Sequence, residues 1–218
     1  HTSTLTNGAG DNSYRYAGAN PNNYVCFGSN ENPCPTDNLY RIIGVFGDQV
    51  KLIKYDYANS NLLGTDGDYS SDTFSKTLYT VYKGELTTIN LYYWNNSTRN
   101  NTWSESLLNK VNLNKNFIAK IEAEWAKKIA TTTWKVGGNT QANISEQPAK
   151  TAYQNEIVSP VTTNTTDGAT EYSAKIGLMY ASDYGFAAAP SAWTSTLYGY
   201  NSSSITSVNG DVWMDNFP

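Results

Sequence analysis

The sequence predicts an α+β fold of short antiparallel strands with two adjacent helices. Two β-branched runs, at residues 39–46 and 50–55, flank a short Gly-Asp turn and predict a hairpin. Apolar residues then recur at helical spacing between residues 102 and 130. Strand-like segments return after residue 131. Strands and helices thus follow one another in blocks, which favours α+β over alternating βαβ units.

The segments around this hairpin are polar. Residues 1–13 are small and polar and predict a leader or linker, so that residues 14–218 form one predicted domain. Residues 56–101 are rich in Asn, Ser, Asp and Tyr, and they predict short strands and surface loops.

Two helices are expected, at about 102–111 and 114–130. Thr102 and Glu105 have the spacing of a capping box, in which each side chain accepts a hydrogen bond from the backbone of the other residue. In the second helix one face is apolar, which predicts core packing. Its members are Phe117, Ile118, Ile121, Trp125 and Ile129.

The last third of the chain alternates strands with turns. We expect a strand at residues 131–136, a Gly-Gly-Asn turn at 137–139 and a further strand at 174–180. Residues 183–186 are expected to turn out of that strand. The tail from residue 190 onward carries aromatic residues among Ser and Asn.

The composition excludes several classes of function. Only 16% of the 218 residues are charged, whereas Asn, Ser and Thr make up 71, a balance typical of secreted β-rich proteins. His1 is the one histidine, so the domain holds no internal base for a Ser-His-Asp triad and no His-based zinc site. A copper site at His1 would need a second His, so a tag remnant or an arbitrary chain start is the better interpretation. No cofactor is predicted.

Charge and hydropathy limit the partners. The net charge is −4 with three Arg, which disfavours nucleic acid. No run of 18 apolar residues occurs, so no membrane insertion is predicted in this segment.

Cys26 and Cys34 are the only cysteines, and the residues between them favour a tight loop. A short disulfide-closed loop is the prediction, with two reduced thiols as the alternative. By loop-closure entropy the bond would stabilise the fold by roughly 2–3 kcal/mol, and it would imply an oxidising compartment.

Four stretches of the chain resemble a family of bacterial surface domains that is common in gut Gram-positive lineages and often prepilin-associated. These stretches are residues 14–28, 37–45, 129–138 and 175–186. The resemblance implies a C-type-lectin-like fold, shared with formylglycine-generating enzymes, and a displayed adhesive or ligand-binding role at the cell surface. The enzymatic relatives use a cysteine pair late in the fold, so their activity is not carried over. Family members continue beyond the segment around Trp213, whereas this chain stops at Pro218, as a fragment, a processed form or a divergent ending.

Two sets of residues are candidate sites. Tyr and Trp among Asn and Ser resemble antibody paratopes, so we expect a ligand platform in the tail, with core packing as the alternative interpretation. Its members are Trp193, Tyr198, Tyr200 and Trp213. Asp66, Asp68 and Asp72 have the spacing of a weak calcium site but lack the EF-hand pattern, so a solvated loop is favoured and no metal is predicted.

Three functions are therefore weighed. The first is an extracellular, non-enzymatic binding or adhesion domain that recognises a glycan or protein on a host or neighbouring cell. The second is a pilus or fibre subunit that assembles with other copies of itself. The third is a carbohydrate-active enzyme with two carboxylates about 5–10 Å apart.

Overall fold

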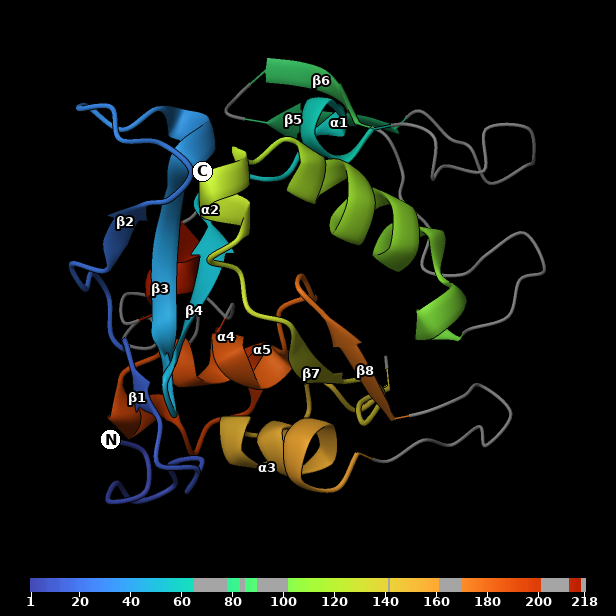
Figure 1. The fold of residues 1–218 in the computed structure, drawn as a ribbon. Coiled ribbons are helices and arrows are strands. Elements are labelled where there is room, and N and C mark those ends of the chain that lie inside the picture. Colours follow the sequence, from blue (N-terminus) through green and yellow to red (C-terminus); the bar gives the residue numbers. More distant parts are fainter. Residues whose placement is uncertain are drawn as a thin grey trace.

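The computed structural model describes residues 1–64, 78–82, 85–89, 102–140, 142–160, 170–200 and 212–216. Figure 1 shows a long hairpin, formed by β3 (Leu39–Phe46) and β4 (Gln49–Lys54), at one side of the molecule. The helical run around Leu108–Phe117 and the short α1 (Ser60–Leu63) and α2 (Ala123–Ala126) lie near one end of this hairpin. The helices α3 (Ala149–Tyr153) and α4 (Ala181–Ala187) lie near the other end. This mixture of helices and antiparallel sheets confirms the predicted α+β class.

The described strands form a four-stranded sheet and two two-stranded sheets, all antiparallel. In the larger sheet β3 pairs with β4 along one edge and with β1 and β2 along the other. β5 pairs with β6, and β7 pairs with β8. The strand bounds are β1 Tyr14–Arg15, β2 Tyr24–Cys26, β3 Leu39–Phe46, β4 Gln49–Lys54, β5 Leu78–Tyr82, β6 Glu85–Ile89, β7 Thr132–Lys135 and β8 Glu171–Ala174.

The helices are short, apart from one π-helix at Leu108–Phe117. The α-helices are α1 Ser60–Leu63, α2 Ala123–Ala126, α3 Ala149–Tyr153, α4 Ala181–Ala187 and α5 Leu197–Tyr200. The 3-10 turns are Thr36–Asn38, Trp103–Glu105, Pro190–Ala192 and Trp213–Asn216, and a second π-helical turn is Gln154–Val158. Within the described ranges, no helix has both the length and the apolar character needed to cross a bilayer.

The larger sheet separates two apolar clusters because side chains alternate between its faces. Tyr40 and Leu52 belong to a cluster with the π-helix residues Leu113 and Phe117. Ile43 and Ile53 belong instead to the larger cluster. The other buried members of that cluster come from residues near the N-terminus, α3, α4, α5 and the last described segment: Ala9, Ala149, Ala152, Tyr153, Phe186, Ala187, Ala188, Ala192, Trp193, Leu197, Tyr200, Val212, Trp213 and Met214.

The predicted helix boundaries are wrong. Instead of helices at 102–111 and 114–130, one helical run extends from residue 107 to 119, and Thr102 occupies the N-cap position of a separate 3-10 turn. The expected apolar residues still pack without a continuous helix. Phe117 is buried from the π-helix, while Trp125 contacts the Phe27 ring (centroids 5.3 Å apart) from the four-residue α2.

Two predictions near the C-terminal third are also corrected. The strand expected at 174–180 is β8, at Glu171–Ala174, and the turn expected at 183–186 is the helix α4. A distant carboxylate stabilises the start of this helix: the Ala181 and Ser182 amides each donate to Glu156 at 3.0 Å. Sequence spacing alone gives no signal of a cap that comes from another element.

The first 13 residues, for which we predicted a leader or linker, contain the buried side chains of Thr2, Ala9 and Ser13. The Thr2 hydroxyl donates to Asp11, and Ala9 joins the larger apolar cluster. This segment is therefore packed against the rest of the protein.

Candidate functional site

The π-helix at Leu108–Phe117 repeats a pattern every five residues. The sequence reads Leu-Asn-Lys at 108–110 and again at 113–115, and Ile-Ala-Lys follows at 118–120. A π-helix closes its hydrogen bonds between residues five apart, so like residues fall above one another. In an α-helix the same spacing would place them roughly 140° apart around the axis. π-helical segments occur frequently at functional sites, so this helix is a candidate position for one.

Asparagines dock the π-helix onto its neighbours. The side-chain amides of Asn112 and Asn116 both donate to the Leu63 carbonyl, at 2.9 and 2.8 Å. Asn114 forms a pair of 3.0 Å hydrogen bonds with the backbone N–H and C=O of Ile176. These bonds hold α1 and the loop after β8 at defined positions beside the helix.

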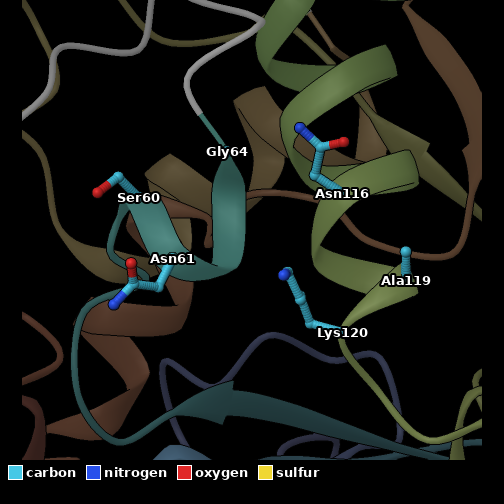
Figure 2. A pocket seen from close by; sticks show the side chains of 6 residues that line it. All are labelled: Ser60, Asn61, Gly64, Asn116, Ala119 and Lys120. Atoms are coloured by element: carbon cyan, nitrogen blue, oxygen red, sulfur yellow. The ribbon is translucent and has the colours of Figure 1, made fainter.

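A groove of about 610 Å³ lies between α1 and the C-terminal end of the helical run. Figure 2 shows Lys120 extending into the space between the two elements and Asn116 projecting from the helix toward Gly64. The groove offers hydroxyl, amide and ammonium groups, and among the described residues its lining contains no carboxylate. The lining residues are Ser60, Asn61, Gly64, Asn116, Ala119 and Lys120.

The predicted aromatic platform is corrected by burial. Trp193, Tyr200 and Trp213 lie in the larger apolar cluster, and each is 2% exposed or less. Their polar atoms bond to the backbone; Trp213 Nε1, for example, donates to the Tyr16 carbonyl at 2.8 Å. Tyr198 alone of the four is on the surface, with 68% of its area exposed. Three of the four rings therefore serve the core, which was the alternative interpretation.

The cysteine prediction is confirmed, and the calcium candidate is left open. Cys26 and Cys34 form a disulfide with their Cα atoms 5.8 Å apart. Asp66, Asp68 and Asp72 lie outside the described residues. The solvated loop stays the prediction and the weak calcium site the alternative hypothesis, which an unchanged melting temperature in millimolar calcium and in chelator would contradict. Within the described residues no three His, Cys, Asp or Glu side chains gather as a metal site.

Buried carboxylates gather around Arg15, away from the groove residues. Asp183 contacts Arg15 at 3.1 Å and Lys51 at 2.5 Å, and Arg15 also contacts Asp11 at 3.0 Å. The four side chains form an alternating chain of charges between the N-terminal segment, β1, β4 and α4. Pairing with an opposite charge offsets the free-energy cost of burying these side chains.

Asp11, Asp183 and Glu156 each accept at least two hydrogen bonds. Burial by itself raises the pKa of Asp11, but hydrogen bonds from Ser13 and Thr2 and the charge of Arg15 outweigh it and lower the pKa to about 2. Glu156 accepts from the first two amides of α4. These acids hold the fold together, and their lone pairs are engaged.

The groove residues were not among the sequence-based site predictions. A signal for them was present, because the five-residue repeat from Leu108 to Lys120 marks a π-helix and ends at the groove. At the spacing of an α-helix, residues five apart lie on different faces, so the repeat is not a signal for an amphipathic α-helix. α1 forms the other side of the groove and belongs to an Asn/Ser-rich segment, whose sequence contains no comparable repeat.

Comparisons with known proteins add no relative to this picture: the chain matches no protein-family model, no curated protein and no solved structure.

Proposed function

We propose that this protein is an extracellular, non-enzymatic binding or adhesion domain whose groove between α1 and the π-helix takes a glycan. The observation that carries the proposal is the lining of the groove. Hydroxyl and amide groups from Ser60 and Asn61 match the donor and acceptor pattern of a sugar's hydroxyl groups. Polar side chains at a concave surface are how small ligands are oriented and selected.

An extracellular location is supported by two features. The Cys26–Cys34 disulfide is stable in an oxidising compartment. The chain is rich in Asn, Ser and Thr and poor in charge, as secreted proteins often are. The bacterial surface family and the C-type-lectin-like fold that the sequence resembles belong to this proposal, and the mixed α and antiparallel β content agrees with them.

Binding is favoured over a two-carboxylate hydrolase. A glycosidase needs one carboxyl that gives up its proton and another that attacks or activates water. Among the described residues the groove lining has no carboxylate. The acids around Arg15, Asp11 and Asp183, pair with cations, and Glu156 accepts from two backbone amides. Asp11, with its lowered pKa, is a poor proton donor near neutral pH.

A variant that fills the groove tests the proposal. Ala119 lines the groove and is exposed, so Ala119→Trp adds bulk there without removing a polar contact. We expect the wild-type protein to bind members of a glycan array and the variant to lose at least tenfold in affinity. Ala123→Trp, at an exposed site on α2 outside the lining, is the matched control and should bind like wild type. Absence of glycan binding by the wild type would refute the proposal.

A fibre subunit is the second candidate, because one sheet face is partly uncovered. Tyr14, Val45 and Val50 are cross-strand neighbours on β1, β3 and β4, with exposed fractions of 60%, 36% and 54%. Val50→Lys would place a charge among these three exposed side chains and should block association of this sheet face with a second copy of the protein. Filaments in the wild type that the variant lacks, seen by electron microscopy, would favour this function; monomers at all concentrations would remove it.

A further inference from the structure

Three lysines follow the π-helix toward the groove. Lys110 and Lys115 are five residues apart, so the π-helical geometry places them about one turn apart on the same side. Lys120 comes after a further five residues and extends into the groove (Figure 2). We call Lys110, Lys115 and Lys120 the lysine row.

The lysine row is a local concentration of positive charge on an acidic protein. Residues 106–121 contain these three lysines and no Asp or Glu, whereas the whole chain has a net charge of −4. All three side chains are exposed. Within the described part of the chain none of them forms an ion pair, in contrast to Lys127, which contacts Glu124 at 2.9 Å.

We propose that the lysine row and the groove together bind an acidic polysaccharide, one whose repeating sugars carry carboxylate or sulfate groups. This inference rests on the proposed glycan-binding function and specifies its ligand class. Ammonium groups along the helix attract the repeated anions, while Ser60 and Asn61 of α1 bond the hydroxyl groups between them. Several weak charge contacts in a row give useful affinity to a polymer through multivalency.

A polysaccharide is favoured over a nucleic acid for two reasons. Nucleic acid carries a charge on every phosphate and its binding depends mainly on neutralising many of them, whereas the lysine row supplies three ammonium groups. Single-stranded nucleic acid is bound by aromatic rings on which its bases stack, and the described lining of the groove holds none. Amides and a hydroxyl are better suited to sugar hydroxyls.

The test compares four probes and five proteins by isothermal titration calorimetry at low salt. The probes are a polyuronate oligomer, a heparin oligosaccharide, a dextran oligomer of similar length and a single-stranded oligonucleotide. The proteins are the wild type, Ala119→Trp, Lys120→Gln, the double variant Lys110→Gln/Lys115→Gln, and the control Lys127→Gln/Lys150→Gln. The control removes two exposed charges outside the row, and circular dichroism checks that each variant is folded.

We expect at least one acidic polysaccharide to bind ten times more tightly than dextran, and its affinity to fall with salt. Lys120→Gln should weaken this binding about threefold to fivefold and the double variant about tenfold, because each exposed ion pair contributes modestly. The control should change it less than twofold. The polyuronate and heparin arms distinguish carboxylate from sulfate recognition.

The possible failures are separable. Equal binding of dextran and acidic probes, unchanged in the lysine variants but lost in Ala119→Trp, would overturn this inference and leave the glycan-binding function standing. Tighter binding of the oligonucleotide than of either acidic polysaccharide would also overturn it. If no carbohydrate binds the wild type, both the inference and the proposed function fail.

Discussion

At the scale of single residues, Lys54 on β4 is a charged side chain that is largely buried and weakly paired. Its side chain is only 9% exposed, and its Nζ lies 3.8 Å from the exposed Asp37. Within the described residues this buried nitrogen has no hydrogen-bond partner. Burial lowers the pKa of Lys54, although the nearby Asp37 and Asp56 oppose the shift. A charge in this setting weakens the fold unless its pairing is good.

Lys54→Met should therefore stabilise the protein. Methionine keeps the chain length and removes an ammonium group that the interior does not satisfy, so we expect a gain of about 1–3 kcal/mol in the free energy of unfolding. Urea unfolding measures it. Lys127→Met, at an exposed position, is the control and should stay within about 0.5 kcal/mol of wild type. A loss of stability in Lys54→Met would show that the Asp37 pair is favourable.

Asp11 should make stability depend on acidity. Its pKa is about 2 in the folded protein, below its ordinary value of 3.8, so the carboxylate stabilises the fold above about pH 4 and this contribution is lost as the pH falls toward 2. Asp11→Asn should cost about 2 kcal/mol at pH 6 and almost nothing at pH 2. Urea unfolding across this range measures the difference from wild type. Asp48→Asn, in the exposed β3–β4 turn, is the matched control and should leave stability at pH 6 nearly unchanged.

At the scale of elements, the π-helix depends on asparagine bonds as much as on apolar packing. Asn109 and Asn112 are fully buried, and Asn114 links the helix to the loop after β8. Side-chain amides can satisfy backbone groups that lie outside regular pairing. This is why an Asn-rich segment, which composition alone would assign to the surface, forms a central helix.

Asn114→Ala should destabilise the protein by about 2–3 kcal/mol. The change leaves the partly buried N–H and C=O of Ile176 without the partners they now have. Thermal unfolding measures the loss. Lys115→Ala, the next residue on the same helix and exposed, controls for helix propensity and should be nearly neutral. Equal effects of the two changes would mean that the amide bonds to Ile176 contribute little.

At the scale of the whole molecule, Trp213 joins the two ends of the chain. Its ring lies 4.3 Å from the Arg41 guanidinium, and its Nε1 bonds to the Tyr16 carbonyl. Gly18 and Ala188 both form isolated bridges with Val212 next to it. The last described segment is thus part of the core that is built on β1 and β3.

Trp213→Ala should cost about 3–5 kcal/mol, as large-to-small core changes do. Tyr198→Ala, which trims an exposed ring, should stay within about 0.5 kcal/mol. Denaturant unfolding of both variants checks the assignment of these aromatic residues to core and surface. If both variants lose little free energy of unfolding, Trp213 is not a core residue and belongs to the ligand platform that the composition suggests.

The sequence by itself determined the α+β class, the β3–β4 hairpin and the disulfide. These depend on local alternation, a turn and a short spacing between cysteines, all of which are visible along the chain. The helix limits and the start of α4 were not predictable in this way. They depend on partners far away in sequence, such as Ile176 for Asn114 and Glu156 for Ala181.

Only the tertiary structure decided which polar and aromatic residues face the core and which face solvent. Trp193, Tyr200 and Trp213 have the same local composition as the exposed Tyr198, and burial is set by packing between elements. The groove likewise exists because Asn112 and Asn116 hold α1 against the π-helix across some fifty residues of sequence. Local pattern specifies elements, whereas a binding surface arises where distant elements meet.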